Sequence, residues 1–220
     1  MKKVFFDTEF TGLHQNTTLI SVGLIAETGQ TFYAELNDYD ESQVDEWLRK
    51  NVIAKLKFAP PGPGEQEHFS WARGGAAVEL RGDTSTVARY LADWFQELLG
   101  GPLSWVDYAN FGHVPVEPPR LVEEPQIQLV SDCHHYDIVL LHNLWDHAFN
   151  MPKCVHYIPM DICPLLEAAG VDPDVNREEF ARMTDGAEKH NALWDARVIR
   201  ACYRRVNRIL GRAMDEELRK

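Results

Sequence analysis

Three short apolar segments within the first 36 residues constrain the fold of this chain more than any other feature. They cover residues 2–7, 18–26 and 30–36, and the residues that punctuate the connections are Gly12, Asn16, Thr28 and Gly29. Apolar runs joined by connections this short pair as hairpins. We therefore expect the chain to begin with a three-stranded antiparallel β-meander.

Helical and strand patterns alternate through the rest of the 220 residues. We expect strands at 103–108, 126–131 and 155–160, and helices at 41–51, 84–98, 136–144, 162–169 and 191–210. A meander followed by this alternation is typical of an α/β fold with a central mixed β-sheet flanked by helices. The length fits a single domain spanning residues 1–220.

Two stretches depart from this alternation. Residues 59–83 contain the run Pro60-Pro61-Gly62-Pro63-Gly64 and further glycines, so we expect a loop-rich or mobile excursion there and not a second core. Residues 111–125 contain four prolines, so we expect that stretch to be irregular.

The formal net charge of −12 argues against a protein that coats nucleic acid, because such proteins present a basic surface. It is compatible with an enzyme that holds a few nucleotides. No apolar run reaches the length of about 18 residues that a membrane span needs. Asp7 also interrupts the N-terminal apolar run before a signal-peptide core could form. We expect a cytoplasmic protein that does not enter a membrane.

Asp7 and Glu9 lie at alternate positions at the end of the first expected strand. Alternate side chains of a strand project from the same face. Two buried carboxylates repel each other unless a cation lies between them, and hard oxygen ligands favour Mg²⁺ or Mn²⁺. Taken alone, the motif fits solvated carboxylates at a strand end equally well.

A third carboxylate lies where the strand at 126–131 gives way to a helix. The pair Tyr136-Asp137 precedes an apolar pattern that would anchor the helix while the Asp137 carboxylate points into a cleft. Asp132 competes for the same role. Either Asp could instead cap the helix, because Asp is favoured at helix N-termini.

His190 and Asp195 form the last group, at the start of the C-terminal helix. Five helical positions rotate by about 500°, which leaves the two side chains about 140° apart. They would therefore not bind one metal as adjacent helical ligands do. His190 on a non-helical lead could swing toward a metal held by Asp195, while the small residues Ala192 and Ala196 let the helix pack close to the sheet. In the alternative, His190 and Asn191 cap the helix and Asp195 faces water.

The order Asp-x-Glu, aromatic-Asp, His-x4-Asp resembles the DEDDh 3′-5′ exonucleases, which include ribonuclease T and oligoribonuclease. Within that group the chain looks closest to the small mycobacterial-type 3′-5′ exoribonucleases. The resemblance runs from Met1 to about Asn207, apart from the two stretches at 59–83 and 111–125. It implies a ribonuclease H-like fold and the release of nucleoside 5′-monophosphates from single-stranded RNA or DNA 3′ ends, with RNA favoured over DNA.

The resemblance also assigns roles to residues. It implies that two Mg²⁺ or Mn²⁺ ions are held by Asp7, Glu9, Asp137 and Asp195, with His190 as the general base. This sequence departs from the family where Asp132-Cys133 replaces a usual His-Asn pair and where Phe10 replaces a commoner Thr. These departures concern substrate details.

Relatives in this group often pair two subunits, so the resemblance leaves open whether this protein is a homodimer.

Two further sets of residues are candidates for substrate binding. Phe10 and Leu13 could stack on the terminal bases, or they could pack in the core. Six arginines at helical spacing could guide a phosphate backbone, but we expect a solvated face on which they pair with Glu and Asp: Arg197, Arg200, Arg204, Arg205, Arg208 and Arg212.

Three other functions stay open. The same fold could be catalytically inactive and bind nucleic acid or a partner protein, or the same chemistry could act on DNA. A zinc site could use the cluster Cys133, His134, His135, Cys154 and His156, although structural zinc sites normally use tighter ligand pairs.

Overall fold

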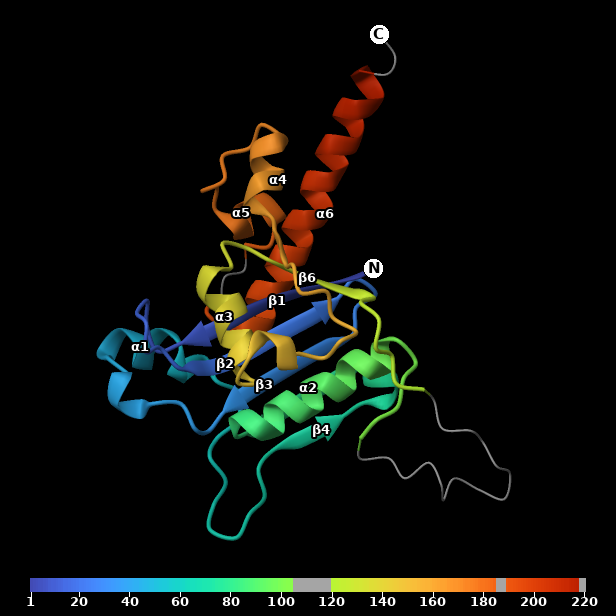
Figure 1. Ribbon diagram of the computed structural model, residues 1–220. Helices are drawn as coiled ribbons and strands as arrows, with labels where there is room; N and C mark the ends of the chain where they lie inside the picture. Colours follow the sequence, from blue (N-terminus) through green and yellow to red (C-terminus); the bar gives the residue numbers. More distant parts are fainter. Residues whose placement is uncertain (105–119, 185–188, 218–220) are drawn as a thin grey trace.

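The computed structural model describes residues 1–104, 120–184 and 189–217. Within them a seven-stranded mixed sheet forms the centre, in the order β4-β5-β3-β2-β1-β6-β7 (Figure 1). Strands β1 (Lys2–Phe10), β2 (Leu19–Ala26) and β3 (Thr31–Leu36) are successive antiparallel neighbours, which confirms the expected meander. The flanking helices complete the α/β, ribonuclease H-like arrangement that the sequence predicts.

Four more strands extend the meander at both sides. β6 (Ile127–Ser131) lies parallel to β1, and β7 (Met160–Asp161) lies parallel to β6. On the other side, β5 (Ala77–Gly82) lies parallel to β3, and β4 (Phe69–Trp71) pairs antiparallel with β5. The sheet is therefore mixed, with parallel pairs flanking an antiparallel centre.

Strands β4 and β5 fall inside residues 59–83, so the expectation of a loop-rich excursion was wrong for that part. In β5 the side chains of Val78 and Leu80 are buried while those of Glu79 and Arg81 are partly exposed. This alternation is the pattern of a strand. The strand was not predicted because it is short and lies between glycines, which indicate a loop.

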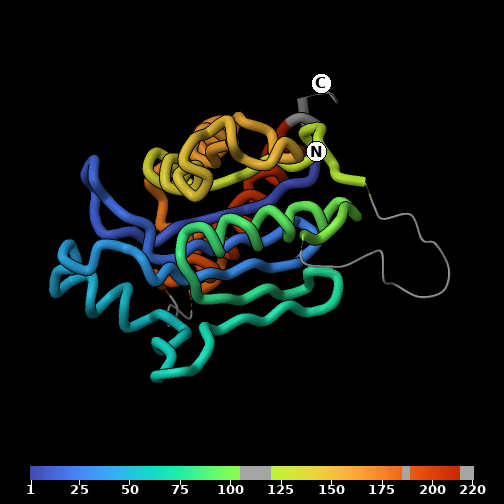
Figure 2. Tube along the Cα trace, turned by 60° about the horizontal axis from the view of Figure 1, so that its bottom comes forward, coloured from blue at the N-terminus to red at the C-terminus, as the bar shows by residue number. Residues whose placement is uncertain are grey.

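Helices cover both faces of the sheet (Figures 1 and 2). On one face, α2 (Thr84–Leu98) and α3 (His135–Asn143) pack over a core that includes Phe6 of β1. On the other, α6 (Ala192–Glu217) packs with α4 (Cys163–Ala168) and α5 (Arg177–Ala181) over a core that includes Phe5. Neighbouring residues of β1 thus face opposite layers.

Several shorter elements differ from expectation. The helix expected at 41–51 is a 3-10 turn followed by α1 (Glu46–Asn51), and the strand expected at 155–160 contributes only β7 and a bridge from Val155 to Ile127. Helix α5 was not predicted. The strand expected at 103–108 and most of the stretch at 111–125 lie outside the described residues. Among the described residues, the 3-10 helices are Glu41–Gln43, Ile53–Lys55, Arg73–Gly75 and Ala148–Asn150.

The first turn of α6 lies directly on β2. A Cβ added at Gly23 would be 2.2 Å from the backbone nitrogen of Leu193, so only glycine permits this approach. Ala192 and Ala196 are fully buried, as expected from their small size. The close packing brings the beginning of α6 to the level of the sheet.

None of the helices in the described residues combines the length and the hydropathy that a membrane span requires.

Candidate active site

Asp7, Glu9 and Asp195 come together between β1 and the first turn of α6. Asp7 and Glu9 follow Phe5 at alternate positions and so face the α6 layer, where Phe5 packs. Asp195 projects from the first turn of α6. One carboxylate oxygen from each of the three residues lies within 4.8 Å of the others. The structure thus brings together three of the four carboxylates that the sequence singled out.

Asp137 reaches the same region from α3. β1 pairs with β6 only from Lys2 to Phe5, so the edge of β1 beyond Phe5 has no partner strand among the described residues. The Asp137 carboxylate binds this unpaired edge in place of a strand. Its Oδ1 accepts hydrogen bonds from the Thr8 backbone nitrogen (3.1 Å) and from the Thr8 hydroxyl (2.6 Å). Asp137 is therefore bound to β1 and does not serve as the helix cap.

A cavity of about 390 Å³ connects the four carboxylates with His190. Burial raises the pKa of Asp7 well above its usual value, and repulsion from Asp137 and Asp195 adds to the effect. Burial and the same two neighbours raise the pKa of Glu9 to about 8. Burial also raises the pKa of Asp137 and brings the pKa of Asp195 to about 7. Buried carboxylates that lie this close together repel one another, and a bound cation would relieve the repulsion.

His190 lies in the non-helical segment directly before α6, as expected. Its backbone has a φ of 67°, in the left-handed region, and its N–H donates a 3.0 Å hydrogen bond to Asp195 Oδ2. Its ring meets the ring of Trp47 edge-on, with centroids 5.3 Å apart. Burial first, then the positive charges of Lys189 and Lys55, lower the pKa of the His190 imidazole. The ring is therefore neutral near pH 7 and able to accept a proton.

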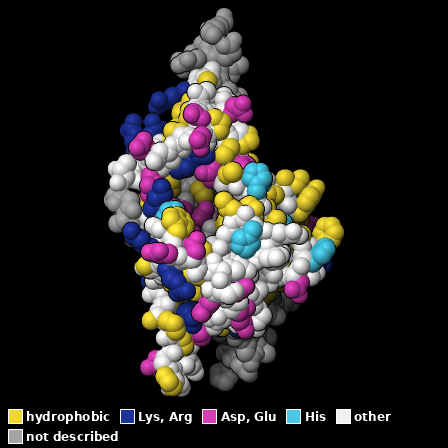
Figure 3. Space-filling view, turned by 90° about the vertical axis from the view of Figure 1, so that its left-hand side faces the viewer, with side chains coloured by type: hydrophobic (Ala, Val, Ile, Leu, Met, Phe, Trp, Pro, Cys, Tyr) yellow, Lys and Arg dark blue, Asp and Glu magenta, His cyan; other side chains and the backbone are white. Residues whose placement is uncertain are grey.

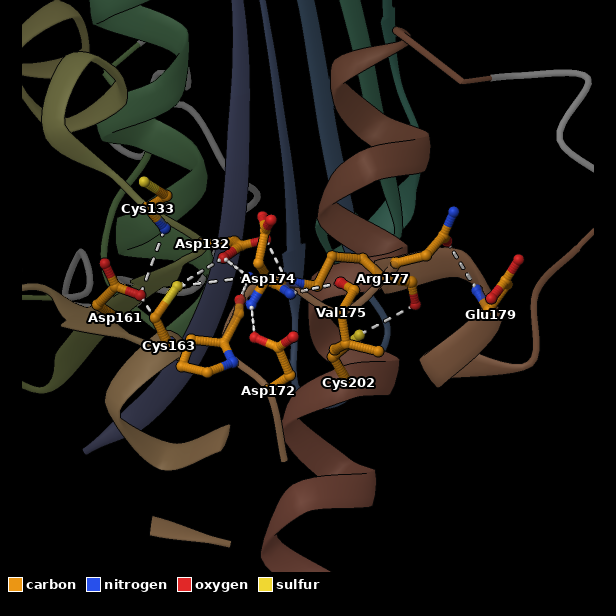
Figure 4. A network of polar contacts seen from close by, with 12 residues as sticks. Asp132, Cys133, Asp161, Cys163, Asp172, Asp174, Val175, Arg177, Glu179 and Cys202 are labelled. Atoms are coloured by element: carbon orange, nitrogen blue, oxygen red, sulfur yellow. Dashed lines mark hydrogen bonds and ion pairs between the residues drawn. The ribbon is translucent and has the colours of Figure 1, made fainter. Parts of the chain in front are cut away.

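Asp132, the alternative candidate for the role of Asp137, forms an ion pair with Arg177 (Figure 4). The Arg177 guanidinium binds it at two points, with Nε 2.5 Å from Oδ2 and Nη2 2.8 Å from Oδ1. The Cys163 thiol donates a third bond to Asp132 across 3.1 Å. Asp132, Asp161 and Cys163 also lie close enough to hold a cation, but the guanidinium already compensates Asp132. Asp132 therefore fastens α5 to the end of β6.

The two candidate base-stacking residues have different positions. Phe10 lines the cavity and stacks on Tyr136 with ring centroids 5.6 Å apart, while also packing on the core. Leu13 is 76% exposed and does not line the cavity. Phe10 is thus at the site, whereas Leu13 is an exposed residue outside its lining.

The arginines of α6 do not pair with acidic residues as expected. Four of them donate to backbone carbonyls: Arg200 to Ala26, Arg204 to Glu27, Arg205 to Phe180 and Arg208 to Arg204. None of the six takes part in an ion pair with a residue that the structure describes. Arg200, Arg204 and Arg205 thus join α6 to the end of β2, to the turn that follows it and to α5.

The zinc hypothesis gains no support from the arrangement. Cys133 is exposed, with its sulfur 3.6 Å from His135 Nδ1, whereas Cys154 is buried in the core. Among the described residues, the two groups able to hold a metal include none of the five zinc candidates.

Sequence reasoning missed the residues that support the carboxylates. Thr8 was passed over because it points away from Asp7 and Glu9, toward α3. Arg177 belongs to a helix of five residues, too short to show a periodic pattern. Glu178 and Lys189 line the cavity as well, and no local pattern distinguishes them from ordinary surface charges.

Comparison with known proteins agrees with this geometry. The sequence signature of the 3′-5′ exoribonuclease Rv2179c-like domain family matches residues 2–206. The chain belongs to this family. Two similar proteins of Mycobacterium tuberculosis are named 3′-5′ exoribonuclease MT2234.1 (strain CDC 1551 / Oshkosh) and 3′-5′ exoribonuclease Rv2179c (strain ATCC 25618 / H37Rv). Each is 36% identical over 64 residues, which cover 29% of this chain and 36% of the relative. The match thus spans about a third of the relatives' length.

Proposed function

We propose that this protein is a two-metal-ion 3′-5′ exonuclease that releases nucleoside 5′-monophosphates from single-stranded 3′ ends and prefers RNA to DNA. The observation that carries the proposal is the grouping of Asp7, Glu9 and Asp195 within 4.8 Å, in one cavity with Asp137 and His190. Membership in an exoribonuclease family supports RNA as the substrate.

The residues fit divalent cations. All four carboxylates offer hard oxygen donors, which suit Mg²⁺ and Mn²⁺. Burial raises the pKa of Asp7, Glu9 and Asp195, and repulsion from neighbouring carboxylates adds to the effect. When bound, two such ions supply positive charge to the attacking and leaving oxygens of the phosphodiester.

The chain's own residues would perform the remaining tasks. His190 would accept the proton of the attacking water, because its lowered pKa keeps the ring neutral at physiological pH. The edge-on contact with Trp47 would restrict the rotation of that ring. Thr8 would hold Asp137 in place through two hydrogen bonds to one oxygen, leaving the other oxygen for a cation.

Phe10 would supply a flat apolar surface for the terminal base. Its ring is already stacked on Tyr136, so its orientation is fixed before a base arrives. Stacking of this kind tolerates any base, which suits an enzyme that shortens a strand one nucleotide at a time.

The test is digestion of matched 12-nucleotide RNA and DNA strands, labelled at the 5′ end, with Mn²⁺ or Mg²⁺. We expect a ladder that shortens from the 3′ end, faster for RNA, with nucleoside 5′-monophosphates as products. An Asp7→Asn variant and EDTA should abolish it. Cleavage starting inside the strand, or no metal-dependent cleavage of either strand, would contradict the proposal.

A further inference from the structure

A second cavity is lined by the residue that follows His190 in the chain, Asn191, and by residues of α6. It has a volume of about 480 Å³, and its lining includes Tyr33, Lys55, Lys57, Glu79, Asn191 and Arg197. The catalytic cavity is lined by Lys189, His190 and Asp195. His190 and Asn191 are consecutive, so adjacent residues of the chain line the two cavities. We name the second cavity the basic groove.

The basic groove is positively charged in a protein whose formal net charge is −12. Three cations and one carboxylate line it, and Lys57 lies 2.5 Å from that carboxylate, Glu79. Arg197 forms no ion pair with any residue that the structure describes. On the face that carries α1, acidic side chains lie in a hollow that Lys and Arg side chains border (Figure 3).

A buried network holds the groove in shape. Glu35 is 1% exposed and accepts a 2.8 Å hydrogen bond from the Tyr33 hydroxyl. The same carboxylate accepts from the backbone nitrogens of Lys57 and Phe58, which fixes the segment that carries the two lysines. Asn191 donates a hydrogen bond to the Tyr33 hydroxyl across 3.4 Å and so joins this network to the segment directly before α6. The lysines and the catalytic His190 therefore have fixed relative positions.

We propose that the basic groove binds the phosphodiester backbone of the nucleotides that precede the 3′-terminal one. The proposal rests on the proposed exonuclease function and extends it. A strand whose last nucleotide occupies the catalytic cavity must extend out of that cavity. Asn191, which follows His190 in the chain, lines a neighbouring cavity that also carries three cationic side chains. Contacts to phosphates are independent of base sequence, which suits an enzyme that removes nucleotides one at a time.

The test compares a double variant, Lys55→Gln with Arg197→Gln, with the wild type on a 12-nucleotide RNA and on a dinucleotide. Measurements at pH 8 keep His190 neutral whether or not Lys55 is present. We expect KM for the 12-mer to rise about tenfold while kcat and the dinucleotide KM stay within about twofold. The salt dependence of log KM should weaken by about 1.4, since each lost phosphate contact on a single strand contributes about 0.7.

Two matched variants control the test. Arg208→Gln removes a cation from the same helix but from a different cavity, and it should leave KM unchanged. Arg197→Lys keeps the charge and should retain most of the affinity, and thermal melting verifies that each variant is folded.

The outcomes separate the two proposals. An active wild type whose double variant keeps its 12-mer KM overturns the groove alone, as does a larger effect of Arg208→Gln. Equal losses on the 12-mer and the dinucleotide also overturn it, because they would place the cations at the catalytic site. A wild type that removes no nucleotide overturns the proposed function and the groove with it.

Discussion

The backbone N–H of His190 donates a hydrogen bond to Oδ2 of Asp195 across 3.0 Å, so the proposed base and a proposed metal ligand are joined through one bond. The bond requires the left-handed backbone at His190, where φ is 67°. The same carboxylate lies within 4.8 Å of those of Asp7 and Glu9. Proton transfer and metal binding can nevertheless be separated, because the bond involves only the His190 backbone.

Replacing His190 by Asn should remove the base and keep the site. Asn tolerates the left-handed region better than most residues, so the bond to Asp195 survives. We expect kcat to fall by about 10²–10⁴, the usual contribution of a general base. The rise in melting temperature that Mn²⁺ causes should remain. Loss of this rise in His190→Asn would show that the ring or its backbone holds the metal, whereas Asp195→Asn should lose both properties.

Thr8→Val should weaken the site through Asp137. The substitution removes the 2.6 Å bond from the hydroxyl but keeps the shape of the side chain and the backbone bond. A hydrogen bond to a charged group contributes about 1.5–3 kcal/mol, and loss of a residue that orients a metal ligand costs about 10–100-fold in affinity. Calorimetric titration with Mn²⁺ should detect the change. Thr8→Ser should behave like the wild type, and equal losses in both variants would refute the role of the hydroxyl.

Without metal, the protein should become less stable as the pH rises. Folding raises the pKa of Glu9 from 4.5 to about 8 and that of Asp195 from 3.8 to about 7. The folded state therefore binds more protons between about pH 4 and pH 8, and the free energy of unfolding falls across that window as these groups ionise. Melting temperatures in EDTA should decline from pH 5.5 to pH 8.5.

Two additions check that the carboxylates cause this decline. Saturating Mn²⁺ at pH 8 should restore stability, by about 2.7 kcal/mol at a hundredfold excess over Kd. Asp7→Asn should flatten the decline in EDTA. A melting temperature in EDTA that stays constant or rises over this range would contradict the electrostatic account.

Asp132 should prove structural and not catalytic. The side chains of Arg177 and Asp132 are only 19% and 18% exposed, and breaking a buried pair costs about 3–5 kcal/mol. Arg177→Gln should therefore lower the free energy of unfolding by about 2–4 kcal/mol, since the exposed fraction reduces the effect. Asp132→Asn should leave the number of bound Mn²⁺ ions unchanged. A loss of Mn²⁺ binding in Asp132→Asn would assign the ligand role to Asp132.

Gly23→Ala should disturb the site by displacing the first turn of α6. The new methyl group would overlap the backbone of Ala192 and Leu193, where the first turn of α6 begins. Overpacking of this kind costs about 1–3 kcal/mol, and the shift of α6 would move Asp195 away from Asp7. Chemical denaturation and Mn²⁺ titration should both show losses. Full stability and metal affinity in this variant would contradict the close packing.

The sequence predicted the parts of the site that local patterns encode. The alternation in β1 places Asp7 and Glu9 on one face, and the small residues Ala192 and Ala196 mark the side of α6 that packs on the sheet. The supporting contacts join residues far apart in the chain: 129 positions separate Thr8 from Asp137, and 45 separate Asp132 from Arg177. The periodicity of apolar residues within one helix or strand carries no information about contacts between such distant residues. β5 was missed because its six residues lie among glycines that indicate a loop.

The most direct test of the account is calorimetric titration of Mn²⁺ into the wild type and into Asp7→Asn at pH 7.5. The wild type should bind about two ions per chain, and Asp7→Asn should bind fewer ions, more weakly. Failure of the wild type to bind Mn²⁺, or identical titrations of the two proteins, would contradict it.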